Sequence, residues 1–182
     1  LSRAISHQAP VRRALRSLLS PGTSWFVFVI VLWGWHDPNL YNAALRHQWI
    51  HDIEHITFFV TAMLFWWRIT GAGPRVHQKL SLLGRVALAI AGVPPNMILG
   101  VFLAFASEPL YSFYVAMPRI TGLSALEDQS LSGIIMWIPG SMMYIIAALV
   151  MLFTWMKDEE RKVQVEQARS RPRSITPVEL SS

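Results

Sequence analysis

Two histidines and a glutamate stand close together in the stretch WIHDIEHITFF, which begins at Trp49. On an α-helix, His51 and His55 are four residues apart and lie on one face, one turn above the other, with Glu54 beside that face. This spacing suits two imidazole ligands of one metal ion. The same residues form the pattern H-x-x-E-H of one group of zinc peptidases, in which the glutamate acts as the base. Both interpretations stay open at this point.

The composition indicates a membrane protein. Of the 182 residues, 53% are hydrophobic and 15% are charged, whereas a soluble domain carries about 25% charged residues. The sequence has no cysteine, so a metal site within it must use histidine, methionine, carboxylate or backbone donors. We attribute the net charge of +5 to cytoplasmic arginines rather than to nucleic-acid binding, because membrane proteins collect basic residues on that side.

Apolar runs predict the fold class, an all-α membrane protein with four transmembrane helices. A helix of about 20 residues crosses a bilayer, and the predicted spans are approximately residues 24–35, 49–67, 82–105 and 131–156. The third span contains GVPPN, in which Pro94 and Pro95 remove two amide donors and should bend the helix. The chain then divides into a basic amphipathic flank, a four-helix membrane domain and a polar cytoplasmic tail, at residues 1–23, 24–156 and 157–182.

The distribution of charge predicts that both termini are cytoplasmic. Basic residues gather in the N-terminal segment, in the second connection and just after Met156, whereas the first and third connections carry one arginine each among several carboxylates. Cytoplasmic loops hold the excess of lysine and arginine, which predicts a multi-pass protein of a bacterial-type inner membrane. The flank, with the sequence PVRRALRSLLS, is expected to form an amphipathic helix on the inner surface of the bilayer.

With this topology, ionisable groups from several spans meet on the outer, periplasmic side. His36 ends the first span, the pair His51 and His55 opens the second, and Asp128 precedes the fourth. Polar groups at membrane depth usually face partners inside a bundle. The candidate metal ligands are therefore His36, His51 and His55, with Glu54, Asp128 and Met136 as side chains that support or orient them. Imidazoles with carboxylate and thioether groups nearby suit copper, with zinc close behind.

These motifs, in this order, resemble the CtaG family of cytochrome c oxidase assembly factors. The resemblance extends over about residues 12–161 and is carried by WGWHDPNLYNAAL, WIHDIEHITFFVTAMLFWW, EPLYSFY, EDQSLSGIIMWIPGSMMYIIAAL and DEER. It implies a polytopic inner-membrane protein without enzymatic activity that helps copper-containing oxidases to mature, on the outer side where copper is delivered. Family members usually have further N-terminal spans with histidines, so we expect either a fragment or a short variant with an incomplete site.

Three functional hypotheses follow from the residues and the resemblance. The leading one is an assembly factor that handles copper as transient cargo, with a membrane-bound copper-containing oxidase or its subunits and the lipid bilayer as partners. The second is a structural accessory subunit of a membrane enzyme complex without metal chemistry, which would dock through residues 122–133. The third is an intramembrane zinc peptidase, in which Glu108 or Glu127 would add the third ligand to the two histidines.

Overall fold

The computed structural model describes residue 17 and residues 20–72, 80–118 and 122–170. The described residues form helices and connections without any strand, which confirms the all-α class. The helices are α2 Pro21–Trp35, α3 Pro38–Arg46, α4 Gln48–Thr70, α5 Leu82–Ala91, α6 Val93–Ala104, α7 Ser112–Ala116 and α8 Ala125–Ser170. The amphipathic helix expected in the N-terminal flank lies outside the described residues.

Short local signals set where these helices begin and end. Ser20 caps α2 by accepting a hydrogen bond from the Thr23 amide at 3.3 Å, and Asp37 caps α3 in the same way. A side-chain oxygen at this position satisfies amides that have no partner within the helix. α4 ends at Gly71, whose φ of 65° is a left-handed conformation that glycine adopts without strain.

The third predicted span is interrupted close to its two prolines. α5 stops at Ala91 and α6 starts at Val93, with Gly92 between them and the two prolines in the first turn of α6. Proline is tolerated in a first helical turn because amides there lack intrahelical partners. Asn96, in the same turn, donates from its Nδ2 to the Met136 carbonyl on α8, at 2.8 Å.

Two segments of the described chain are long and apolar enough to cross a membrane. They are Leu82–Ala104, with 23 residues, and α8, with 46 residues. α2 is apolar but has only 15 residues, and α4 has 23 residues with several polar side chains in its first turns. The helices are thus compatible with a membrane protein, while the four-span topology stays a prediction.

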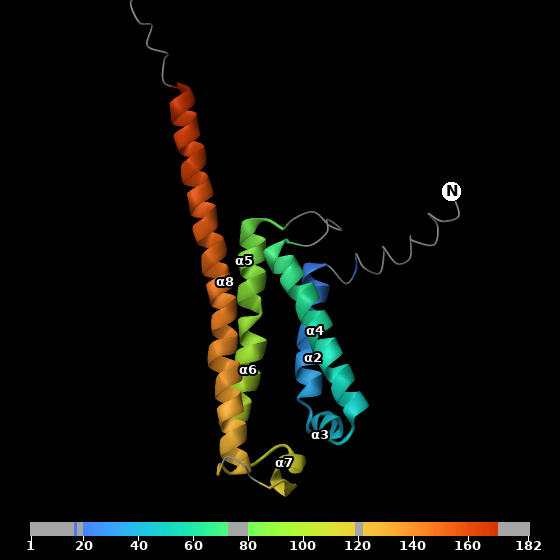
Figure 1. The fold of residues 1–182 in the computed structure, drawn as a ribbon. Coiled ribbons are helices and arrows are strands. Elements are labelled where there is room, and N and C mark those ends of the chain that lie inside the picture. Colours follow the sequence, from blue (N-terminus) through green and yellow to red (C-terminus); the bar gives the residue numbers. More distant parts are fainter. Residues whose placement is uncertain (1–16, 18–19, 73–79, 119–121, 171–182) are drawn as a thin grey trace, which may run out of the picture.

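The helices form an elongated bundle. Figure 1 shows α5 and α6 alongside α8, and α2 alongside α4, while α3 and α7 lie at the end where α4 and α8 begin. The two parts meet in the core, where the rings of Trp66 and Tyr144 stack with centroids 5.3 Å apart. Arg85 of α5 also donates to the carbonyls of Ile69 and Thr70 at 2.6 and 2.7 Å and so caps the end of α4.

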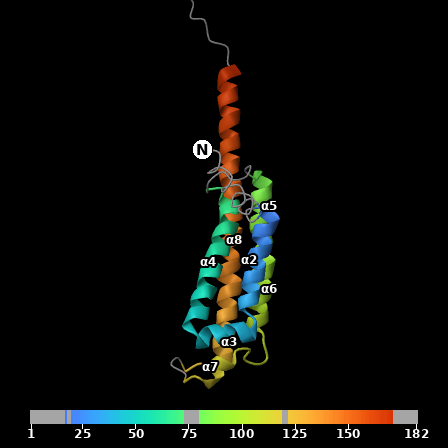
Figure 2. The same cartoon turned by 90° about the vertical axis from the view of Figure 1, so that its right-hand side faces the viewer.

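The helix α8 extends well past the other helices at the opposite end (Figures 1 and 2). Its 46 residues correspond to about 69 Å at 1.5 Å per residue. The predicted boundary between membrane domain and tail, after Met156, falls inside this continuous helix. Residues 157–170 are therefore helical, and residues 171–182 lie outside the described part.

Candidate functional site

The two histidines of α4 lie against each other, as their spacing predicts. Their Nε2 atoms are 3.1 Å apart, and the ring centroids are separated by 4.4 Å. Two nitrogens that bind one metal ion at about 2.0–2.1 Å each stand about 2.8–3.4 Å apart for angles between 90° and tetrahedral. The observed separation falls in this range. It is also that of a hydrogen bond between the two imidazoles, and an ion bound to both rings would displace the shared proton. His51 is half-buried and His55 is exposed, which leaves the pair open to ligands from outside.

Glu54 lies beside this pair but is buried, with 8% of its surface exposed. Its carboxylate interacts electrostatically with both imidazoles of the pair and also with Tyr41 and Tyr111. A negative charge at this place favours a cation bound between the two rings. Glu54 thus lies between the exposed histidine pair and the buried tyrosines at this end of the bundle.

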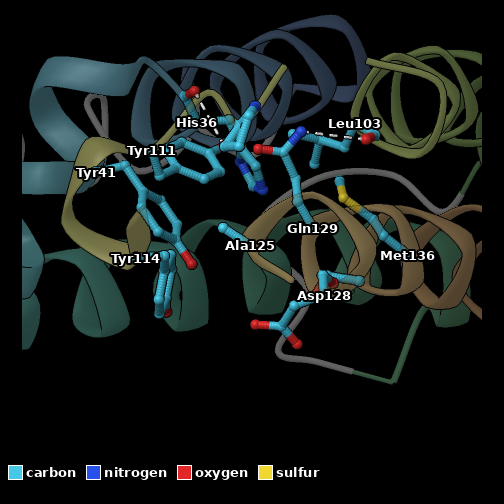
Figure 3. Close-up of a pocket in the computed structure, with 11 residues that line it drawn as sticks. His36, Tyr41, Leu103, Tyr111, Tyr114, Ala125, Asp128, Gln129 and Met136 are labelled. Atoms are coloured by element: carbon cyan, nitrogen blue, oxygen red, sulfur yellow. Dashed lines mark hydrogen bonds between the residues drawn. The ribbon is translucent and has the colours of Figure 1, made fainter. Parts of the chain in front are cut away.

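A cavity of about 250 Å³ lies at the same end, between the end of α2, α3, α7 and the first turns of α8 (Figure 3). Three of the predicted site residues line it, namely His36, Asp128 and Met136. The other lining residues are Tyr41, Leu103, Pro109, Tyr111, Tyr114, Ala125, Gln129 and Ser132. Among the described residues, no lysine or arginine lines this cavity.

His36 is fixed by its neighbours in one tautomer. Its Nδ1 lies 2.7 Å from the Leu32 carbonyl, which can only accept, so we place the ring proton on Nδ1 and the lone pair on Nε2. The ring also contacts Tyr41 and Phe58, with centroids 6.2 and 6.3 Å away. Burial lowers the pKa of His36 from its ordinary value, and the hydrogen bond to Leu32 opposes this only partly. The imidazole is therefore neutral at pH 7.

Three tyrosines form one wall of the cavity, and the sequence interpretation did not include them. The rings of Tyr41 and Tyr111 stack at 4.0 Å, and Tyr41 and Tyr114 are 6.4 Å apart. Burial raises the pKa of Tyr111 to about 12, and it raises that of Tyr41 as well. Both rings are thus neutral. The spacing of Tyr111 and Tyr114, just before and within α7, was the available signal, but their partner on α3 could not be identified from it.

Gln129 fixes two backbone segments that border the cavity. It is buried, its Oε1 accepts a hydrogen bond from the Leu110 amide at 2.7 Å, and its Nε2 donates to the Leu103 carbonyl at 3.4 Å. One side chain from α8 therefore fixes the end of α6 and the connection toward α7. Both halves of the amide are occupied by protein groups, so Gln129 shapes the cavity.

The predicted ligands divide into two places. His51 and His55 are together on α4, whereas His36 lies in the cavity with Asp128 and Met136. Within the described ranges, no three His, Cys, Asp or Glu side chains lie together as a metal-binding group. The two histidines of α4 therefore share no third ligand of these types, neither His36 nor a glutamate of the peptidase hypothesis. Glu127 accepts from the Ser124 amide at 2.7 Å while Ser124 Oγ accepts from the Glu127 amide, an arrangement that caps α8.

Comparisons with known proteins test the resemblance directly. The family model described as cytochrome c oxidase caa3 assembly factor (Caa3_CtaG) matches residues 1–158. No curated protein and no solved structure matches the chain. The matched range includes the histidine pair, Glu54 and every residue that lines the cavity. The chain belongs to the Caa3_CtaG family of cytochrome c oxidase assembly factors.

Proposed function

We propose that this assembly factor binds copper as cargo at the pair formed by His51 and His55 and passes it to a membrane-bound oxidase. The observation that carries the proposal is the 3.1 Å separation of the two Nε2 atoms on a face open to the outside. Imidazole nitrogens suit copper. Two protein ligands leave further positions on the ion for a donor or an acceptor protein, as transient loading requires.

The proposed placement in the membrane has four spans, namely α2, α4, the bent α5–α6 segment and α8. With both termini in the cytoplasm, the end of the bundle that carries α3, α7 and the histidine pair faces the outer compartment. Support comes from Arg68 of α4 and Arg85 of α5, which lie toward the opposite end, and from the position of α3 and α7 at one end (Figure 1). Copper then arrives from the periplasmic side.

Glu54 has a supporting role in this proposal. A copper ion adds positive charge between two imidazoles, and the buried carboxylate that acts on both rings offsets part of that charge. Coulomb interactions of this kind are stronger away from bulk water than at a surface. The carboxylate stays out of the ion's open positions, which remain free for exchange.

The test compares cells that carry the double variant His51→Ala, His55→Ala with cells that carry His47→Ala. His47 is exposed and lies just before α4, so His47→Ala makes the same kind of substitution outside the histidine pair. We expect oxidase copper content and activity to fall at least several-fold in the double variant and to stay at the wild-type level in the control. The membrane content of the factor, measured by immunoblot, corrects for changes in expression.

Unchanged copper content in the double variant would contradict the proposal. If the proposal holds, copper bound to the purified protein should disappear in the double variant, as measured by mass spectrometry of the metal. Co-purification with the mature oxidase at fixed stoichiometry and without copper in this chain would favour the accessory-subunit hypothesis instead.

A further inference from the structure

We infer that the cavity beside α3 and α7 is a second copper site, which takes Cu(I) through His36 and Met136 and is separate from the pair on α4. The inference rests on the proposed function in its choice of metal. The three predicted histidine ligands then belong to two separate sites, one exposed on α4 and one inside the cavity.

The state of His36 prepares it for a metal. Its Nδ1 proton is held by the Leu32 carbonyl at 2.7 Å, and Nε2 keeps its lone pair. Histidines that bind metals almost always donate their other ring N–H to a carbonyl or carboxylate in this way, because the bond fixes the ring and its tautomer. Figure 3 shows the ring at the cavity wall next to Tyr111 and Gln129.

The side chains that line the cavity favour a soft metal cation. Tyrosine rings attract cations through their faces, and Tyr41, Tyr111 and Tyr114 line the cavity, with no lysine or arginine among its described lining residues. Met136 supplies a thioether, and a donor set of imidazole and thioether selects Cu(I) over the harder Zn²⁺ or Mg²⁺. Figure 3 shows Gln129 between His36 and Met136, and the three rotatable bonds of methionine allow the thioether to change its position.

The two places are distinct because the pair lies on α4, whereas His36 follows α2 and no described residue of α4 lines the cavity. Glu54 is buried, and Phe58, four residues on, packs edge-on against His36 with centroids 6.3 Å apart. His55, one position after Glu54, is exposed. An ion on the pair is therefore reached from outside, whereas an ion at His36 lies among aromatic rings.

The test uses the full chain, purified in detergent and titrated with Cu(I) under anaerobic conditions against a chromogenic chelator. We expect two Cu(I) ions per wild-type chain. We expect one Cu(I) ion in the double variant His51→Ala, His55→Ala, and one in the single variant His36→Ala. X-ray absorption of the copper should show a sulfur neighbour in the wild type and in the double variant. Met136→Leu should remove this sulfur, whereas Met142→Leu, at an exposed position of the same helix, should keep it. Circular dichroism confirms that each variant is folded.

The outcomes separate the inference from the proposed function. One Cu(I) with nitrogen neighbours only, lost in the double variant of α4, would overturn the cavity site and leave the proposed function standing. If the double variant of α4 binds as many Cu(I) ions as the wild type and keeps the sulfur neighbour, this would support the cavity site and overturn the role of the pair. Absence of Cu(I) binding, or a sulfur neighbour that survives Met136→Leu, would overturn the inference.

Discussion

One hydrogen bond determines what His36 can do. A neutral imidazole can present either nitrogen, and the Leu32 carbonyl at 2.7 Å selects the tautomer with the proton on Nδ1. Burial keeps the ring neutral by lowering its pKa. These two effects act together, because a ring that is protonated on both nitrogens has no lone pair for a metal. The same burial makes protonation of His36 unfavourable for the folded protein.

The stability of the metal-free protein should therefore depend on pH through His36. The unfolded chain takes up a proton at this residue below about pH 6.5, whereas the folded chain does so only at lower pH. The contribution is fully present above pH 6.5 and is lost as the pH falls through the folded-state pKa. We expect the thermal unfolding midpoint to fall more steeply between pH 7.5 and pH 5 in the wild type than in His36→Asn, which keeps a donor for Leu32.

The matched control for this measurement is His47→Asn, which makes the same change at an exposed position and should keep the wild-type slope. Circular dichroism in detergent, with a chelator present, records the midpoints. Equal slopes in the wild type and in His36→Asn would show that His36 titrates alike in the folded and unfolded protein.

At the scale of the elements, the contact between α6 and α8 gives the bundle its closest packing. A Cβ atom added to Gly133 would lie 2.5 Å from the Ala104 amide nitrogen and 2.7 Å from the Gly100 carbonyl oxygen. Both neighbours are backbone, so they can move only if the helices separate. Small residues permit such close approach between membrane helices, where packing and interhelical hydrogen bonds replace the hydrophobic effect. The Asn96 bond to the Met136 carbonyl lies on the same interface.

Gly133→Ala should therefore destabilise the bundle. Overpacking of this kind costs about 1–3 kcal/mol, and the variant should lower both the unfolding midpoint and the amount of protein in the membrane. Gly34→Ala is the control, because a Cβ atom there meets nothing within 4 Å, and its effect should not exceed about 1 kcal/mol. A Gly133→Ala protein as stable as the wild type would show that α6 and α8 are not held at this distance.

Most helices could be predicted from the sequence, because apolar length and proline position are local signals. The helix break at Gly92 follows from Pro94 and Pro95, and the predicted spans agree with α2, α4 and α5–α6 to within a few residues. The short α3 was missed as an element, although Asp37 followed by Pro38 is a common helix start. The predicted fourth span stops at Met156, before α8 ends, because the charged residues that follow have no apolar pattern, although their helix propensity is high.

The candidate site was predictable only in part. The contact between His51 and His55 follows from helix geometry alone, since both lie on α4. The separation of His36 from them does not, because it depends on how α2, α3 and α7 pack around Tyr41 and Tyr111. Tertiary stacking of this kind joins residues 70 positions apart in the chain, and no local pattern reports it.

For the whole molecule, the proposed role depends on which end of the bundle faces the outer compartment. The positive charge near the end that carries the α4–α5 connection favours a cytoplasmic location, and α8 extends in that direction (Figure 2). The histidine pair and the cavity share the opposite end, so one orientation exposes both to periplasmic copper. The reverse orientation would expose both to the cytoplasm.

Single cysteines can decide the orientation, because the sequence has none of its own. Asn39→Cys, on α3, and Gln164→Cys, on the extension of α8, both replace exposed side chains. In spheroplasts, a membrane-impermeant maleimide should label the first variant and should label the second only after permeabilisation. The cysteine-free parent is the control. Labelling of Gln164→Cys from outside would place the pair on the cytoplasmic side, and receipt of copper from the outer compartment would then be impossible.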